Sequence, residues 1–378
     1  MKIRFLSTLA AICTLFVAGA SAQTSTAVVY RYTAISYPGT VAQETSANGI
    51  NNSNVIVGSY PDPTTGVGHA FEYINGKYTT FDFPGASGTF AMGINDYGDV
   101  VGSYTLPNSS NSHGFLRHNG AFTTIDYPGA SDTALVGINN AGTIVGNEDS
   151  NNGFIYKNGT FTLYSAPTRG TLPNYFSTLF GINNPGQFVG EEQSGDYLQG
   201  FWVTGNDADF LEPNTYFANN NVTGINGRSD IVGCLNSGPY VAFAVESSES
   251  SESTEKFPTL QMLSNPLASQ SCPSGINYSR VIVGNPGFMA APILTLNVTS
   301  PANHVKVSNP VHVVANASGV NPISQMQVWA NFKEVYHVSG GSLNTYLNLP
   351  AGSNERFVVQ AIDSKGVIAK VVESITVN

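Results

Sequence analysis

The sequence has little charge, little cysteine and no long apolar run beyond its first residues. Only 11% of its 378 residues are Asp, Glu, Lys or Arg, and the formal net charge is −10 at pH 7. A chain with so few basic residues is not expected to bind nucleic acid or an acidic membrane surface. It also lacks a Gly-rich phosphate loop, a Gly-x-Ser-x-Gly elbow and a His-Glu-x-x-His motif. These absences weaken an enzyme interpretation, and we expect no cofactor. Metal dependence stays open.

The one long apolar run lies at the N-terminus and predicts export. Lys2 and Arg4 precede an apolar run from Leu6 to Ala20, and small residues end the segment at Ala22. The run is too short to span a bilayer, so residues 1–22 are predicted to be a cleaved signal peptide. Cys13 lies in the wrong context for a lipid anchor. We expect a secreted protein, in the extracellular space, at the cell surface or in a periplasm, with no membrane span.

Only Cys234 and Cys272 remain once this segment is removed. An exported chain meets an oxidising environment, so a disulfide between them is predicted. Closing a loop of this length stabilises the fold by roughly 4 kcal/mol in the chain-entropy model. The alternative is a catalytic thiol, but no histidine lies near either cysteine in the sequence.

What the chain does contain is a repeat. Gly-Ile-Asn occurs six times, and each copy has a second glycine nine residues after its first. The start-to-start spacings are 44, 44, 44, 43 and 51 residues, which is the range of four-stranded propeller blades. The copies begin at Gly49, Gly93, Gly137, Gly181, Gly224 and Gly275, and the second glycines are Gly58, Gly102, Gly146, Gly190, Gly233 and Gly284.

Each unit reads as four short strands, with Asn-Gly turns such as Asn119-Gly120 marking hairpins. The sixth unit leaves the pattern before its fourth strand, whereas an unmatched copy of that strand, Thr33–Gly39, precedes the first unit. We therefore predict an all-β chain whose residues 24–291 form a six-bladed β-propeller closed by the N-terminal strand. A linear β-solenoid is the alternative.

Residues 292–378 lack the repeat and contain short segments in which apolar and polar residues alternate. This pattern predicts a separate β-sandwich. Trp329 and Phe357 are the expected centre of its core. The closing segment Val359–Gly366 resembles the late strand and turn of bacterial immunoglobulin-like domains, which commonly act as spacers or adhesion modules.

The repeat units resemble an extracellular bacterial family named for the tripeptide His-Ala-Phe, present here as His69-Ala70-Phe71 and, altered, as His113-Gly114-Phe115. The resemblance covers roughly residues 30–290. It implies an exported repeat protein but no particular activity or catalytic set. His69 and His113 occupy equivalent places, as do Asp82 and Asp126, and this repetition favours a structural role for both pairs.

Tight turns join strands one and two, and strands three and four, so they lie on one face of the predicted disc. The variable joins lie on the other face, where we expect any binding site. Carboxylates there could bind a cation or serve glycosidic cleavage, or they could simply form solvated acidic loops. Tyrosines could stack on sugars, or they could be ordinary surface and packing residues. The candidates are Tyr60, Tyr104, Glu148, Asp149, Tyr175, Glu191, Glu192, Asp196 and Tyr197.

The leading hypothesis is a secreted, non-catalytic interaction protein that binds extracellular polysaccharide or a cell-surface protein through this face. One alternative is an extracellular propeller glycoside hydrolase or lyase, whose first acids to test are Glu148, Asp149, Glu191 and Glu192. Another is a structural surface or adhesion component. The sequence does not determine the oligomeric state.

Overall fold

The computed structural model describes residues 25–40, 43–149, 152–166, 174–194, 197–205, 207–210, 221–235, 238–243, 260–263 and 271–378. The described residues form strands and turns. They contain no helix long and apolar enough to cross a membrane. The predicted signal peptide, residues 1–22, lies outside them.

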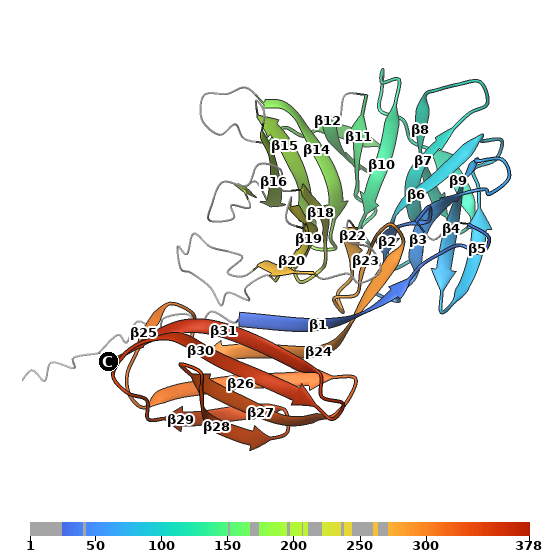
Figure 1. Ribbon diagram of the computed structural model, residues 1–378. Helices are drawn as coiled ribbons and strands as arrows, with labels where there is room; N and C mark the ends of the chain where they lie inside the picture. Colours follow the sequence, from blue (N-terminus) through green and yellow to red (C-terminus); the bar gives the residue numbers. More distant parts are fainter. Residues whose placement is uncertain are drawn as a thin grey trace, which may run out of the picture.

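The first five Gly-Ile-Asn units each fold as a four-stranded antiparallel sheet that resembles a propeller blade (Figure 1). The Asn-Gly turns have the positive φ angles of type I′ hairpins, with 50° at Asn119 and 82° at Gly120. Sheet 1 contains β2 (Ser46–Ile50), β3 (Ile56–Pro61), β4 (Gly68–Ile74) and β5 (Lys77–Phe81), and sheet 2 contains β6 (Gly88–Ile94), β7 (Val100–Thr105), β8 (Ser112–His118) and β9 (Ala121–Thr124). Sheet 3 contains β10 (Thr133–Ile138), β11 (Ile144–Glu148), β12 (Asn152–Lys157) and β13 (Thr160–Leu163). Sheet 4 contains β14 (Asn174–Ile182), β15 (Phe188–Ser194), β16 (Tyr197–Thr204) and β17 (Asp207–Phe210), and sheet 5 contains β18 (Asn221–Ile225), β19 (Ile231–Leu235), β20 (Gly238–Ala242) and β21 (Leu260–Met262).

The sixth unit takes its fourth strand from the other end of the chain. Sheet 6 contains β22 (Cys272–Ile276), β23 (Ile282–Asn285), the first half of β24 (Phe288–Ser300) and β1 (Ser25–Ala34). Ala34 pairs with Phe288 in this sheet. The predicted pairing of the N-terminal segment with the truncated unit is therefore confirmed, but the strand begins and ends earlier than Thr33–Gly39.

The six innermost strands follow one another around a ring. β2 packs against β6 on one side and against β22 of the last unit on the other. The first glycine of each unit permits this approach, because a Cβ on Gly93 would lie 3.0 Å from the Cα of Gly137. A Cβ on Gly275 would lie 3.6 Å from the Cα of Gly49, so the last unit meets the first in the same way. A linear stack would leave these two units apart.

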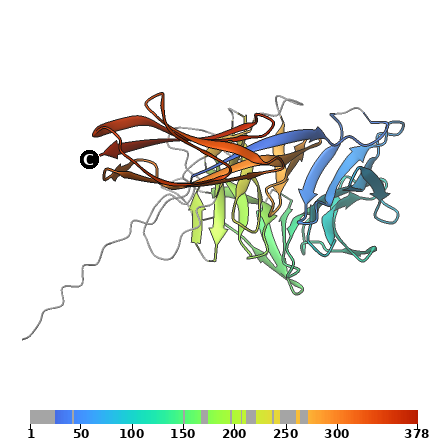
Figure 2. The ribbon, with the colours of Figure 1, turned by 90° about the horizontal axis from the view of Figure 1, so that it is seen from below.

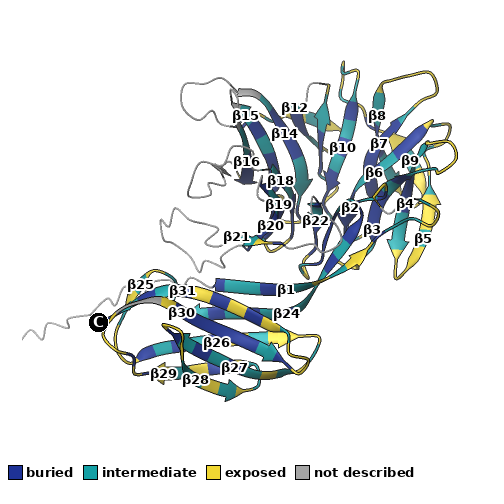
Figure 3. Ribbon diagram, in the orientation of Figure 1, coloured by how far each residue is buried: buried dark blue, intermediate teal, exposed yellow. Residues whose placement is uncertain are grey.

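Apolar side chains fill the space between neighbouring sheets. One cluster joins Val57 and Ala70 of sheet 1 to Ala91 and Phe115 of sheet 2. The second glycine of each unit makes room for the aromatic side chain of the third strand, since a Cβ on Gly102 would lie 2.9 Å from the Phe115 ring. Burial therefore concentrates on the inner strands, and the outermost strands, such as β5 and β9, are the more exposed ones (Figure 3).

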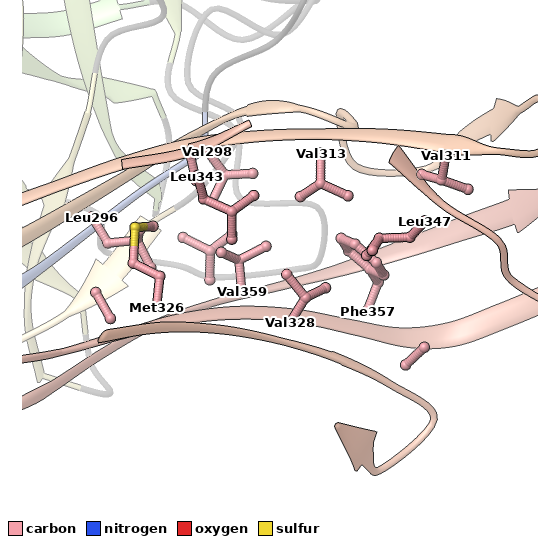
Figure 4. Close-up of a cluster of buried hydrophobic side chains, with 14 of the residues drawn as sticks. Leu296, Val298, Val311, Val313, Met326, Val328, Leu343, Leu347, Phe357 and Val359 are labelled. Atoms are coloured by element: carbon pink, nitrogen blue, oxygen red, sulfur yellow. The ribbon is translucent and has the colours of Figure 1, made fainter. Parts of the chain in front are cut away.

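The C-terminal residues form two sheets packed over one core (Figure 4). Phe357 lies in this core as predicted, with no exposed surface. Trp329 does not, because Met326, Val328 and Ala330 take the inward positions of its strand and place Trp329 on the outer face. One sheet is the first half of β1 and the second half of β24 with β26 (Val311–Gly319) and β29 (Ser342–Leu347). The other is β25 (Val305–Val307), β31 (Ile368–Val377), β30 (Gly352–Asp363), β27 (Ile323–Ala330) and β28 (Lys333–Ser339).

β1 and β24 run side by side through both parts of the molecule (Figures 1 and 2). The predicted boundary between residues 291 and 292 falls inside β24, whose first half pairs with β23 and whose second half pairs with β26. The side-chain amide of Gln261 in sheet 5 accepts a hydrogen bond from Val28 N and donates one to Val28 O. The free edge of β1 is thereby held against the ring.

Candidate functional site

The asparagine of each Gly-Ile-Asn motif links its sheet to the next one. Its side-chain Nδ2 donates to the backbone oxygen of the equivalent asparagine in the following unit, at 2.9 to 3.3 Å. The last of these bonds returns from sheet 6 to sheet 1, which completes the circle. All six side chains are 3–5% exposed. They are Asn51, Asn95, Asn139, Asn183, Asn226 and Asn277, called here the asparagine circle.

The same side chains hold the tight turns that follow them. Asn95 Oδ1 accepts hydrogen bonds from the backbone N–H groups of Tyr97 and Asp99, at 3.0 and 2.9 Å. One amide therefore satisfies two backbone donors of its own turn and one acceptor of the next unit. This double use explains why the motif recurs with asparagine in all six copies, because a buried donor left unpaired costs about 1–3 kcal/mol.

The residue after each circle asparagine surrounds the ring axis on the tight-turn face. Asp96 occupies this place in sheet 2, and its Oδ2 accepts bonds from the amides of Asn52, Asn140 and Asn184, at 2.9, 2.8 and 3.1 Å. These donors come from sheets 1, 3 and 4. Three separate units thus converge on one carboxylate oxygen.

The Asp96 carboxylate is kept ionised by these donors. Burial alone would raise its pKa, but hydrogen bonds from the Asn52 backbone N–H and from the amides of Asn140, Asn184 and Asn52 outweigh burial and lower the pKa. The centre of the mouth therefore carries a fixed negative charge within a rim of neutral amides.

A cavity of about 60 Å³ opens at this point, lined by isoleucines and by polar groups. The volume accommodates a few water molecules or one small ligand group. The isoleucines are those of the six motifs, Ile50, Ile94, Ile138, Ile182, Ile225 and Ile276. We call the rim residues Asn52, Asp96, Asn140, Asn184, Gly227 and Tyr278, with this cavity, the axial mouth.

One side of the axial mouth is aromatic. Tyr278 is 48% exposed, and its ring lies 3.3 Å from the position that a Cβ on Gly227 would occupy. The guanidinium of Arg228 lies 4.3 Å from the centre of this ring, and its Nε donates to Tyr278 O at 3.1 Å. Amide groups, one carboxylate and one aromatic ring therefore line the same opening.

The axial mouth lies on the tight-turn face, opposite to the face where the sequence predicted a site. Asp96, Tyr278 and Arg228 were not among the predicted residues. One signal in the sequence could have indicated this site. The residue directly after Gly-Ile-Asn varies among the six units, as Asn, Asp, Asn, Asn, Gly and Tyr, although the motif itself is constant.

The two predicted tyrosines with described side chains are part of the packing between sheets. Tyr60 and Tyr104 are 7% and 5% exposed. Their rings stack on Tyr37 and Phe83, with centroids 3.5 and 3.6 Å apart, and those partners come from the end of the preceding unit. Because these faces are covered, Tyr60 and Tyr104 do not provide a sugar-stacking surface.

Two of the predicted carboxylates occupy the same repeat position as these tyrosines, two residues after the second glycine. Glu148 accepts a hydrogen bond from the Asn152 amide at 2.6 Å. Glu192 is 1% exposed, and its charge adds to burial in raising the pKa of Tyr164 to about 12. Glu148 is thus bonded within its own sheet, and Glu192 is buried.

The other predicted acids are also separated from one another. Asp149 Oδ1 accepts from the backbone N–H groups of Ser131 and Asp132, at 2.6 and 2.7 Å, which anchors a loop. Glu191 precedes Glu192 on β15, so the two side chains point to opposite faces of sheet 4. Burial raises the pKa of Glu191. Asp196 and the side chains of Tyr175 and Tyr197 lie outside the described residues.

The repeated histidine and aspartate pairs are local. His69 Nδ1 lies 2.8 Å from Asp82, and His113 Nδ1 lies 2.9 Å from Asp126. Asp126 also accepts from the backbone N–H of Gly114. Each pair joins the third strand of its sheet to the segment that follows the fourth, in agreement with the predicted structural role.

The predicted disulfide between Cys234 and Cys272 is present, with Cα atoms 5.8 Å apart. It joins β19 of sheet 5 to β22 of sheet 6. Such bonds persist in oxidising compartments.

No protein-family model matches the sequence, and a search of curated protein sequences finds no match. Solved structures with a similar arrangement include YCF48 bound to D1 peptide, at 11% identity and a TM-score of 0.40, covering 92% of this chain and 98% of that one. YCF48 from Cyanidioschyzon merolae has 10% identity and a TM-score of 0.39, covering 90% and 98%. The extracellular domain of the one-component system BT4673 from B. thetaiotaomicron has 7% identity and a TM-score of 0.33, covering 89% and 58%. These scores are too low to transfer a topology or a ligand.

Among the described residues, no group of three or more His, Cys, Asp or Glu side chains is placed to hold a metal ion.

Proposed function

We propose that this chain is a secreted, non-catalytic binding protein that takes a polar ligand group into the axial mouth. In this proposal residues 24–291 form a six-bladed β-propeller closed by the N-terminal strand, and residues 292–378 form an immunoglobulin-like β-sandwich. The single observation that carries it is the convergence of amides from three sheets on Asp96 above the isoleucine-lined cavity.

The chemistry of the mouth favours a hydroxyl-bearing group. Each of the three rim amides donates one N–H to Asp96 Oδ2 and has a second N–H for a ligand oxygen. Asp96 Oδ1 accepts from Asn52 N and has a further lone pair for a ligand hydroxyl, so both ends of a hydroxyl can be satisfied. The cavity of about 60 Å³ admits an end group rather than a whole sugar ring. The exposed ring of Tyr278 can cover the adjoining carbon atoms. We therefore propose the terminal unit of an extracellular polysaccharide as the partner, and a serine-rich or threonine-rich segment of a cell-surface protein as the second choice.

We do not propose the glycoside hydrolase or lyase alternative. Cleavage by a carboxylate pair requires both acids to face one substrate. Glu191 and Glu192 point to opposite faces of their sheet, and Asp149 is bonded to its own loop.

A glycan array probed with the mature protein tests the proposal. Asp96→Ala removes the central acceptor, and Tyr278→Ala removes the aromatic wall. We expect each variant to lose at least ten-fold in affinity for the glycans that bind. Tyr97→Ala is the control, because Tyr97 is 73% exposed on the same turn as Asp96 but does not line the cavity. Equal loss in all three variants, or unchanged binding by Asp96→Ala, would contradict the proposal.

A further inference from the structure

The C-terminal part has a second surface whose chemistry differs from that of the axial mouth. It is the outer face of the sheet formed by β24, β26 and β29, in which β29 is the strand farthest from the ring (Figure 1). The inward positions of these strands carry core residues, so the alternate positions point outward. The outward residues are Thr295, Asn297, Thr299, His312, Val314, Asn316, Ser318, Ser342, Asn344 and Tyr346, called here the neutral face.

An aromatic pair stands at one end of the neutral face. His312 and Tyr346 are direct cross-strand partners, and their rings stack with centroids 4.4 Å apart and an interplanar angle of 8°. Tyr346 is nevertheless 64% exposed. Since His312 covers one side of the ring, the other side faces solvent and offers an apolar platform.

Hydrogen-bonding groups surround this platform. His312 Nε2 lies 2.8 Å from Asn344 Oδ1. An amide oxygen can only accept, so Nε2 carries the proton in this bond, and Nδ1 of the neutral ring remains an acceptor. Asn316, Ser318, Ser342 and Asn344 are exposed and add further amide and hydroxyl groups.

The neutral face carries no aspartate, glutamate, lysine or arginine, although the whole chain has a formal charge of −10. The outer face of the opposite sheet differs, because it carries Lys370 on β31 and Glu334 on β28. From His312 to Ser318 the outward positions of β26 extend over roughly 20 Å, at about 3.3 Å per residue. A linear, uncharged, hydroxyl-rich chain matches this length and this chemistry.

We propose that the neutral face binds a neutral polysaccharide chain, with one sugar ring stacked on the free side of Tyr346 and sugar hydroxyls bonded to His312 and Asn344. A stacked aromatic contact and a small set of hydroxyl bonds suit a glycan, whose rings have apolar faces and polar edges. The surface is separate from the axial mouth and does not require that site to bind the same molecule.

Affinity electrophoresis of the mature protein tests this inference, in gels containing hydroxyethyl cellulose, galactomannan, dextran or mixed-linkage β-glucan, with alginate as the charged comparison. We expect retardation in at least one neutral gel and not in alginate. Tyr346→Ala should reduce the apparent affinity at least five-fold, whereas Tyr346→Phe should retain most of it. Phe332→Ala is the matched control, because Phe332 is an aromatic residue of the same module that is 77% exposed but lies off the neutral face.

The Asp96→Ala variant distinguishes binding at the neutral face from binding at the axial mouth. Retardation that persists in Asp96→Ala and falls in Tyr346→Ala supports the neutral face, whatever the outcome for the mouth. Retardation that falls only in Asp96→Ala, retardation in alginate alone, or no retardation in any neutral gel would overturn it. Circular dichroism of Tyr346→Ala should match the parent protein, since the side chain lies outside the core.

Discussion

The side-chain amide of Asn277 donates a hydrogen bond to the backbone oxygen of Asn51 at 3.1 Å, although 226 residues separate them. It is the same bond that joins Asn51 to Asn95 and each later motif asparagine to the next. The first and last units therefore meet through the contact that every neighbouring pair uses. The repeated motif therefore supplies the contact that closes the ring.

The asparagine circle should contribute measurably to stability. Asn139→Ala removes an amide that donates to Asn183 O and accepts from the backbone N–H groups of Ala141 and Thr143. Because these groups are buried, we expect a loss of about 1–3 kcal/mol in the free energy of unfolding. Urea titration measures it. Asn316→Ala, at an exposed site, is the control and should change the midpoint little.

Two equivalent glycines should respond differently to alanine. A Cβ on Gly93 would lie 2.9 Å from Val136 O and 3.0 Å from the Cα of Gly137, whereas the nearest atom to a Cβ on Gly181 is 3.5 Å away. Gly93→Ala should therefore destabilise by about 1–3 kcal/mol, and Gly181→Ala should stay within about 1 kcal/mol of the parent. Thermal unfolding of both variants checks this. Equal effects would mean that the inner strands are not packed backbone to backbone.

Glu373 should make stability fall as pH rises. It is 3% exposed in the C-terminal core, and burial raises its pKa from 4.5 to about 7, against a smaller lowering by the Ser25 hydroxyl. Between pH 4.5 and 7 the folded state keeps a proton that the unfolded state releases, so stability declines across this window and stays lower above it. The total is on the order of 3 kcal/mol.

Glu373→Gln removes the titrating group, so urea midpoints from pH 5 to 8 should become flatter than those of the parent. Glu44→Gln, at an exposed position, should leave the parent profile unchanged. A parent midpoint that rises with pH, together with an unchanged slope in Glu373→Gln, would refute the assignment.

The disulfide should leave no free thiol in the mature protein. Cys234 and Cys272 are bonded to each other, and the remaining cysteine, Cys13, belongs to the predicted signal peptide. Titration under denaturing, non-reducing conditions should find no thiol in the exported protein and two after reduction. Two thiols before reduction would show that the bridge does not form. Cys234→Ala with Cys272→Ala should lower stability by up to roughly 4 kcal/mol.

Much of the architecture could be predicted because each repeat unit makes the same contacts with its neighbours. The spacing of the two glycines indicated where inner strands begin and end, and the unmatched segment before Gly49 indicated which strand completes sheet 6. The disulfide followed from the small number of cysteines. These features depend on spacing along the chain, which the sequence displays directly.

The candidate site was harder to predict because it depends on which side of a sheet a residue faces. Tyr60 appeared to lie in a variable join, but Tyr37 from the preceding unit covers it. The sequence predicts Trp329 in the core, but the alternation of its strand points it outward. Asp96 belongs to a tight turn, and its partners Asn140 and Asn184 are 44 and 88 residues away. No pattern of neighbouring residues in the sequence predicts such contacts across the ring.

The most direct test of ring closure is a cross-link between its two ends. Thr33 and Met289 are cross-strand partners in β1 and β24, and antiparallel partners have Cα separations that suit a disulfide. In the folded double variant Thr33→Cys with Met289→Cys, mild oxidation should join these positions, as identified by peptide mass spectrometry. Thr33→Cys with Thr123→Cys, on a strand of sheet 2, should not cross-link. The closed ring would be contradicted if the Thr33→Cys with Met289→Cys variant folds and forms its native disulfide, but residues 33 and 289 stay unlinked.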